Sequence, residues 1–200
     1  MQVNMQKQPP VSRAAADSVV MRRQAPLRTA YKESPQRALV VKRVITVADA
    51  QSDPLHGSVV LPYEGSRWRF GVDRAVGGLH DAPNPGEMLC AALAACAEAS
   101  IRMLADMLGI TLQLLEVEVI GHVDVRGCLG IDRAVPVGFQ TIVCHVRIGA
   151  AMGTPTEAVA MLLARAEHAC VNLATLRSGV AVEVRHEIRS APGVAVRSAV

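Results

Sequence analysis

The strongest local signal in this chain of 200 residues is a helix that begins after Asn84 and ends at Gly109. Asn84 is a favourable N-cap, Pro85 suits the first helical position, and Glu87 can bond back towards the cap. A run of small residues, AALAAC, follows within the helix. At 1.5 Å per residue the helix spans about 36 Å. It is the clearest element of the sequence, and the other predicted elements are described by their position before or after it.

This helix is apolar, but charged residues interrupt it. Glu98, Arg102 and Asp106 follow one another at i, i+4 and i+8, which places them in one stripe on the helix surface. A membrane span needs about 20 predominantly apolar residues, and no uncharged run of that length occurs here. The sequence therefore predicts a soluble, amphipathic helix with no membrane association, and the stripe is most simply a solvated or interface face.

Strand patterns lie on both sides of the helix. Apolar residues alternate with Glu116 and Glu118 over 115–119, the period of a strand with one wet face. Similar signals predict strands over 39–47, over 138–148 and over 180–185, and two short strands around a turn at 64–65 that form an antiparallel meander.

Two further helices are predicted after these strands. Thr154 to Glu157 reads as a capping box with Pro155 at the first helical position, opening a helix that ends at Cys170. A short helix over 172–177 follows and stops at Gly179. Strands and helices are grouped instead of alternating as βαβ units, so the fold class is α+β.

The domain organisation is simple. Residues 1–38 show neither a helical nor an alternating pattern and predict a partly disordered or extended N-terminal arm, 39–190 form one domain, and 191–200 form a tail. The net charge of +3 and the 2% of aromatic residues argue against nucleic-acid binding. Residues 1–30 lack the apolar stretch of a cleavable signal, so a cytoplasmic location is expected.

Five cysteines are the other chemical feature of the sequence, at positions 90, 96, 128, 144 and 170. They form no CxxC pair and no His/Cys cluster, which argues against a metal site. Cys96 lies among alanines near the middle of the long helix, which leaves room for a reactant, although a cysteine there can equally be a small core residue. Cys90 lies about 240° away around the helix and does not share the face of Cys96.

Two separated blocks resemble the OsmC/Ohr superfamily of osmotically induced and organic-hydroperoxide-resistance proteins. The first is VGGLHDAPNPGEMLCAALAAC, in which Cys96 comes eleven positions after Pro85. The second is AEHACVNLATLRSGVAVEV, which resembles the block around the second cysteine of the family, here Cys170. With the strands between them, the resemblance covers about residues 39–188.

The resemblance implies an intertwined α+β homodimer with antiparallel sheets, long central helices and active sites between the subunits. It also implies a stress-response thiol peroxidase without a cofactor. Cys96 would attack an organic hydroperoxide as a thiolate, Cys170 would capture the resulting sulfenic acid as a disulfide, and a dithiol such as a lipoyl group would regenerate the pair. Glu87 is the candidate acidic partner of this site.

The sequence departs from the peroxidase pattern at three points. Gly86 stands where those members have a glutamate directly after the proline, which displaces the acidic residue by one position to Glu87, and a capping role explains Glu87 as well. Val171 replaces the proline that often follows the second cysteine. The activating arginine is not assigned, because four candidates compete, namely Arg43, Arg67, Arg69 and Arg74.

Two other hypotheses remain beside the peroxidase. One is a non-enzymatic dimer of the same fold that binds a small apolar ligand in the cleft between its subunits. The other is a structural or partner-binding protein that acts through the basic N-terminal arm.

Overall fold

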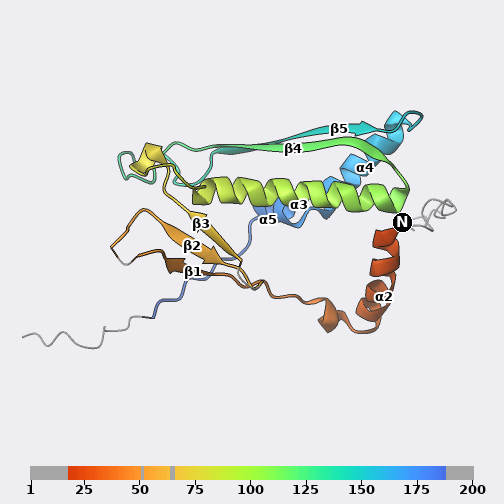
Figure 1. Ribbon diagram of the computed structural model, residues 1–200, viewed down its shortest axis with the longest axis horizontal. Coiled ribbons are helices and arrows are strands. Elements are labelled where there is room, and N and C mark those ends of the chain that lie inside the picture. The colour runs from red at the N-terminus through yellow and green to blue at the C-terminus, as the bar shows by residue number, and fades with distance from the viewer. Residues whose placement is uncertain (1–17, 51, 64–65, 188–200) are drawn as a thin grey trace, which may run out of the picture.

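The computed structural model describes residues 18–50, 52–63 and 66–187 of the chain, which form an α+β structure with two antiparallel sheets, as predicted (Figure 1). The strands are β1 (Ile45–Ala48), β2 (Gly57–Val60), β3 (Arg67–Phe70), β4 (Leu112–His122) and β5 (Thr141–Ala150). The helices are α2 (Val19–Glu33), α3 (Pro85–Leu108), α4 (Thr156–Ala169) and α5 (Val171–Ser178), with 3-10 turns η1 (Pro35–Ala38) and η2 (Arg74–Val76).

Helix α3 has the predicted bounds and the predicted caps. The side-chain oxygen of Asn84 accepts the N–H of Glu87 at 3.0 Å, and the Glu87 carboxylate accepts the N–H of Asn84 at 2.9 Å. Gly109 ends the helix with φ at 66°, in the left-handed region that glycine tolerates best. These reciprocal bonds satisfy backbone donors that the first helical turn otherwise leaves without partners.

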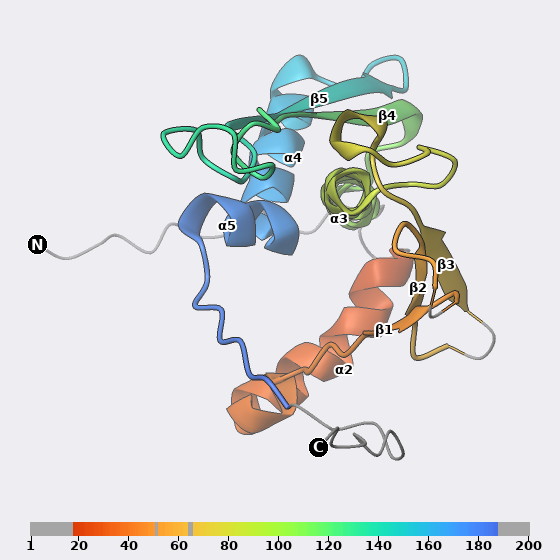
Figure 2. The same cartoon turned by 90° about the vertical axis from the view of Figure 1, so that its left-hand side faces the viewer.

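The core forms where α3 meets α4 and the β4–β5 sheet, and Figure 2 shows α3 end-on between these elements and α2. Ile101 and Ala105 of α3 pack against Leu162 and Ala166 of α4, and all four side chains are buried. The sheet contributes apolar side chains from alternate positions of both strands, namely Leu112, Leu115, Val117, Val146 and Ile148. The alternation predicted over 115–119 is therefore confirmed within β4.

The small sheet confirms the predicted meander, with β2 paired antiparallel to both β1 and β3. The predicted turn at 64–65 lies outside the described residues, and the first strand covers only the end of the predicted run over 39–47. His56 ties this sheet to the segment before α3. Its ring nitrogens each lie 2.8 Å from a carboxylate, one from Asp53 and the other from Asp81.

The predicted strand over 180–185 is wrong for the described chain. This segment pairs with neither sheet, and its valines Val180, Val182 and Val184 are 64%, 80% and 70% exposed. An alternating sequence indicates which side chains would share a face, but a strand also needs a neighbouring strand to accept and donate its backbone hydrogen bonds. No described strand of this chain lies beside the segment.

Helix α2 forms where the sequence predicted a disordered or extended arm, so that prediction is wrong for residues 19–33. Pro26, inside the helix, and the lack of an apolar stripe obscured it. A tertiary contact supports its start. The Asp106 carboxylate of α3 accepts the Ser18 hydroxyl at 2.5 Å and the Val20 N–H at 2.9 Å. The boundaries at residues 38 and 190 remain predictions.

The predicted capping box of α4 is also wrong, whereas the predicted short helix after it is confirmed. Pro155 takes the N-cap position, and no side chain caps the helix. Proline has no side-chain acceptor, so the box at Thr154 is replaced by backbone bonds alone. Helix α5 runs to Ser178, and Gly179 ends it.

Within the described residues, α3 is long and apolar enough to cross a bilayer, and α4 with α5 would reach that length only as a bent pair. The same length and apolarity suit a helix at the centre of a folded domain. Helix α3 packs against α4, α5, β4 and α2, and these contacts bury part of its apolar surface.

The Asp106 contact predicts a pH-dependent attachment of α2. The hydrogen bond from Ser18, followed by the N–H of Val20, lowers the pKa of the Asp106 carboxyl below its ordinary value. A carboxyl with a lowered pKa stabilises the folded state above its unfolded pKa of about 3.9, and the contribution is lost as the pH falls through the folded pKa. We expect Asp106→Asn to speed amide hydrogen exchange in α2 at pH 7, and the difference from wild type to shrink as the pH falls through the lowered pKa of the folded Asp106 carboxyl.

The matched control is Glu98→Gln, on the same stripe of α3, because Glu98 pairs with Arg102 and not with α2. Equal exchange in α2 for wild type and Asp106→Asn at neutral pH would show that the contact does not hold the helix.

Candidate functional site: a thiol pair at a helix junction

Cys170 occupies the junction between α4 and α5. It is the C-cap of α4 and the N-cap of α5, and the two helices bend by 62° there. Its side chain is 1% exposed. After the bend, α5 contacts α3, which brings Cys170 near Cys96 in the middle of that helix.

The structure brings Cys96 and Cys170 near each other, since the Cys96 side chain is among the groups that raise the pKa of the Cys170 thiol. Both are free thiols. Cys96 is half-buried on α3, and the neighbouring alanines Ala92 and Ala97 leave its surroundings uncrowded. A disulfide between these two cysteines requires that they lie close together in the fold, and the sequence alone could not test that requirement.

The two thiols differ in surroundings. Burial raises the pKa of the Cys170 thiol, an effect that the N–H of Leu173 opposes and the neighbouring Cys96 side chain reinforces. A buried thiol with a raised pKa keeps its proton at neutral pH and is a poor first nucleophile. Cys170 therefore suits the second step of a dithiol reaction better than the first.

A pocket of about 790 Å³ reaches the Cys170 side chain between α3, α4, α5 and β5. Apolar side chains make most of its wall, including Leu93, Ile101, Ile142, Leu163 and Leu173. Cys144 of β5 also lines it, and burial, followed by the nearby Glu167, raises the pKa of that thiol. The pocket suits an apolar molecule of moderate size.

One cation lies on this wall. Arg177 of α5 lines the pocket and forms an ion pair with Glu167 of α4 at 2.6 Å. The pair joins the two helices on either side of Cys170. Both side chains are more than half exposed, so solvent screens their charges and the pair stabilises the fold little.

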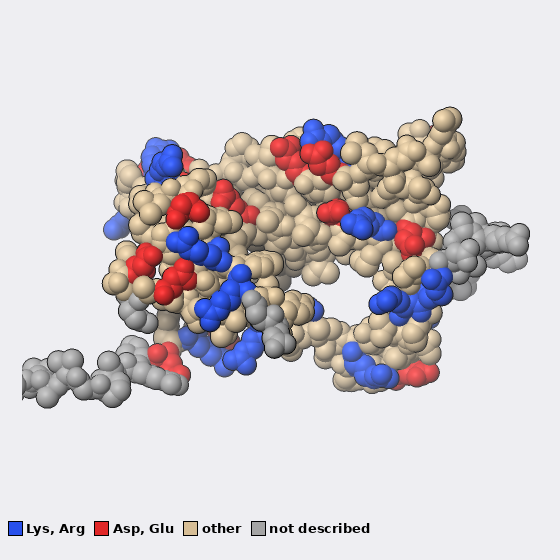
Figure 3. All heavy atoms as spheres, in the orientation of Figure 1, with Lys and Arg blue, Asp and Glu red and all other residues tan. Residues whose placement is uncertain are grey.

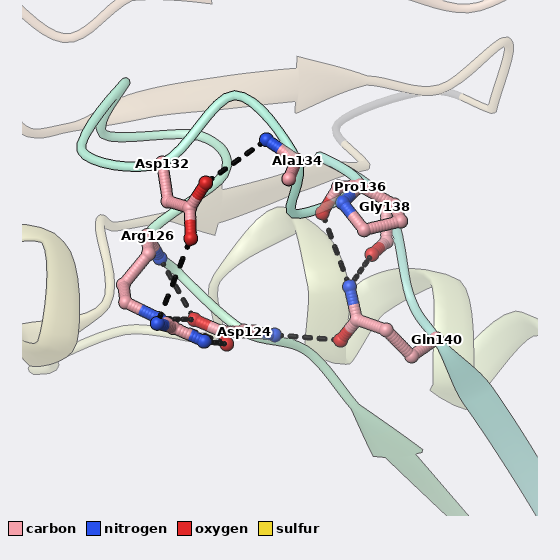
Figure 4. A network of polar contacts seen from close by, with 7 residues as sticks. All are labelled: Asp124, Arg126, Asp132, Ala134, Pro136, Gly138 and Gln140. Carbon is pink, nitrogen blue, oxygen red and sulfur yellow. Dashed lines mark hydrogen bonds and ion pairs between the residues drawn. The ribbon is translucent and has the colours of Figure 1, made fainter.

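The loop between β4 and β5 closes one side of the pocket, and a polar network orders it (Figure 4). The Gln140 side chain donates to the carbonyls of Pro136 and Gly138 at 3.1 and 2.8 Å and accepts the N–H of Asp124 at 2.7 Å. Arg126 pairs with Asp124 and Asp132 across the same loop. Phe139 lies between Gly138 and Gln140, within the segment that this network orders.

Phe139 lies close to the first departure from the peroxidase pattern. A Cβ on Gly86 would come 3.1 Å from the side-chain oxygen of Asn84 and 3.2 Å from the Phe139 ring, so these neighbours would have to shift slightly. A Cβ on Gly121 of β4 would come 2.5 Å from the same ring. Glycine at position 121 therefore makes room for the aromatic side chain, and glycine at position 86 avoids a tight contact with it.

The structure does not bring Glu87 to the thiols within the chain. Glu87 lies nine residues before Cys96, which is about 13.5 Å along the helix. Its carboxylate bonds the Asn84 backbone and lies 3.7 Å from His80. It lines a second pocket, of about 1120 Å³, to which neither Cys96 nor Cys170 contributes.

The candidate arginines are likewise away from the thiols. Arg69 lines the second pocket with Glu87 and pairs with Asp49 at 3.2 Å and Asp81 at 3.6 Å. Arg43, Arg67 and Arg74 are exposed and line neither pocket.

Sequence reasoning missed Arg177, Asn172 and Phe139. Arg177 follows Cys170 by seven residues, a spacing that returns to the same helix face, so it was in principle detectable. Asn172 donates to the Ala92 carbonyl of α3 at 2.8 Å, a contact between segments 80 residues apart that no local pattern predicts. Phe139 acts through its fit to two distant glycines, which is equally non-local.

The fold and the adjacent thiols define an α+β dithiol protein. Comparison with protein families assigns residues 78–185 to the OsmC-like protein family, and since these residues are more than half of the chain, the protein belongs to that family. No curated protein matches the sequence.

Solved structures show the same fold. An OsmC-like protein from Mycoplasma pneumoniae covers 70% of this chain and 89% of its own, with a TM-score of 0.56 and 16% identity. The match to an organic hydroperoxide resistance protein OsmC from Legionella pneumophila covers 70% of this chain and 92% of that protein, with a TM-score of 0.51 and 23% identity. The match to an OsmC-like protein of unknown function from Vibrio cholerae covers 68% of this chain and 94% of that protein, with a TM-score of 0.57 and 12% identity.

The raised pKa of Cys170 predicts slow alkylation. With iodoacetamide at pH 7.5, we expect Cys170 to be labelled at least about tenfold more slowly than the exposed Cys128, because both burial and a small thiolate fraction limit the reaction. Peptide mass spectrometry over a time course measures both rates in one sample. Labelling of Cys170 as fast as Cys128 would contradict the buried, protonated thiol.

Proposed function

We propose that the protein is a thiol peroxidase that reduces organic hydroperoxides through Cys96 and Cys170. The observation that carries the proposal is the contact between the two thiols, which lie on different helices and are 74 positions apart in the sequence. Membership of the OsmC-like family supports it, as does the fold shared with the Legionella pneumophila protein, which is named an organic hydroperoxide resistance protein and a predicted redox protein.

The proposed reaction has two steps. In the first, the Cys96 thiolate attacks the terminal oxygen of the hydroperoxide, the O–O bond breaks, and an alkoxide leaves and takes a proton to become an alcohol. Cys96 is now a sulfenic acid. In the second, the Cys170 sulfur attacks the Cys96 sulfur, a disulfide forms, and the hydroxyl leaves as water with the proton that Cys170 releases.

The environment of each thiol fits its proposed step. Cys96 is half-buried, so a hydroperoxide can approach its sulfur, whereas Cys170 is buried and keeps its proton until Cys96 is oxidised. The apolar pocket is lined by Cys170 and by Ala97, the residue after Cys96, but not by Cys96 itself, and its wall suits the organic part of a substrate that reacts beside it. A dithiol such as a lipoyl group returns the pair to its starting state by thiol–disulfide exchange, becoming a disulfide itself. A cytoplasmic location, where thiols are kept reduced, agrees with this cycle.

The working protein is proposed to be a homodimer. Among the described residues, large apolar side chains are exposed on several elements, including Leu89 and Met103 of α3, Leu114 and Ile120 of β4, and the unpaired valines of 180–185. A space-filling view shows an opening bounded by α3, α2 and the β1–β3 sheet (Figure 3). Exposed apolar surface and an unpaired strand-like segment are typical of a chain that completes its core with a second copy.

Light scattering coupled to gel filtration tests the dimer. We expect a mass of about twice the 21.2 kDa of one chain, unchanged on dilution to micromolar concentration, because the interface would contain core residues. A monomer over the whole concentration range would contradict this assembly.

A peroxidase assay tests the function. Mixing the reduced protein with cumene hydroperoxide should remove two thiols for each hydroperoxide consumed. Cys96→Ser should abolish consumption, because the attacking sulfur is gone. Cys170→Ser should stop after one hydroperoxide, with a sulfenic acid on Cys96 that dimedone traps. Stopped-flow kinetics and intact mass spectrometry measure these outcomes.

Cys128→Ser is the matched control, because Cys128 is exposed and its thiol donates only to the Val125 carbonyl of its own loop. Glu87→Gln in the same assay tests the predicted catalytic role of Glu87. If Cys96 in the folded protein is oxidised no faster than in unfolded protein, the peroxidase is excluded. The alternative is then a dimer that binds a small apolar ligand in the cleft between its subunits, which should bind equally well after Cys96→Ser.

A further inference from the structure

The side chain of Asn172 lies between the two helices that carry the thiols. It comes two residues after Cys170, on the first turn of α5, and donates to the Ala92 carbonyl of α3 at 2.8 Å. Ala92 is four residues before Cys96, so its carbonyl is the one that accepts the Cys96 N–H within the helix. One carbonyl therefore receives a bond from the backbone of Cys96 and a bond from the helix that Cys170 begins.

Helix α5 begins directly after Cys170. Cys170 is the N-cap residue of this helix without capping it through its side chain, and the backbone N–H groups of Leu173 and Asn172 oppose the rise in the pKa of its thiol. Because Cys170 immediately precedes α5, the amide of Asn172 that bonds α3 also holds the first turn of α5, next to Cys170, against the part of α3 that carries Cys96.

This arrangement matters for the second step of the proposed reaction. A disulfide requires the sulfurs to approach to about 2.05 Å with Cα atoms no more than about 7 Å apart. Cys170 lies at a bend of 62° between two helices, where a small change of angle would move its sulfur. A hydrogen bond across the α3–α5 contact restrains that angle, while the bend leaves the freedom needed for the sulfurs to join.

We infer that Asn172 is a positioning residue that holds α5 on α3 so that Cys170 reaches the sulfur of Cys96. The inference rests on the proposed function, and it assigns Asn172 to disulfide closure and not to the attack on the hydroperoxide. Asn172 touches neither substrate nor the reacting oxygen in this role. Its loss should slow closure and leave the formation of the sulfenic acid unchanged.

The test separates the two steps in Asn172→Leu, which keeps the number and branching of side-chain heavy atoms and removes the donor. We expect hydroperoxide consumption in the first turnover at the wild-type rate, disulfide closure about tenfold slower, and a larger fraction of Cys96 trapped by dimedone. Asn172→Gln keeps an amide that can reach the same carbonyl and should recover part of the closure rate. Thr175→Ala, on an exposed position of the same helix, is the matched control and should behave as wild type.

Closure is also measured with diamide, which accepts the two electrons and two protons of the dithiol and forms the disulfide without a hydroperoxide. If hydroperoxide fails to oxidise wild-type Cys96 but diamide closure is slower in Asn172→Leu, the peroxidase proposal fails and the positioning role stands. If Asn172→Leu closes at the wild-type rate with both oxidants, the positioning role is overturned. Equal slowing of both steps, or a changed far-UV circular dichroism spectrum, would instead assign Asn172 to the fold, which also overturns it.

Discussion

Close packing along α3 is the constraint on which the rest of the structure depends. Small residues on α3 let neighbouring helices and strands approach it closely. Each of these neighbouring elements contacts a different part of α3. The β4–β5 sheet and α4 pack against Ile101 and Ala105, α5 bonds to Ala92, and α2 is held by Asp106. The capped start at Asn84 fixes where the helix begins, and so fixes the position of Cys96 relative to all of them.

The local features were predictable because they depend on neighbouring residues. Caps at both ends of α3, the alternation in β4 and the meander of β1–β3 follow from side chains a few positions apart. The strand predicted over 180–185 failed because pairing requires a partner that is not part of the local sequence. Helix α2 was missed for the same reason, since Asp106, 88 positions from Ser18, supports its first turn.

The candidate site divides in the same way. Cys96 and Cys170 were identified from two sequence blocks, and the structure places their side chains in contact. The contacts that surround them were not identified, because Asn172 and Phe139 act on groups that are distant in the sequence. Glu87 satisfied a motif at its predicted position, but its carboxylate bonds the helix start and lies on a different pocket from the thiols.

Gly86 stands where the peroxidase pattern has a glutamate, so this position supplies no carboxylate to the proposed reaction. A Cβ there would come 3.1 Å from the side-chain oxygen of Asn84 and 3.2 Å from the ring of Phe139, so a larger side chain would require these neighbours to shift. The cation that shares the Cys170 pocket is Arg177, which is already paired with Glu167. In the described chain, the difference between the thiols therefore arises chiefly from burial: the buried Cys170 stays protonated, while Cys96 remains accessible. Burial acts on each sulfur through its place in the fold, so the proposed division of roles would follow from the bend at Cys170 and the contact of α5 with α3 more than from a dedicated acid–base pair.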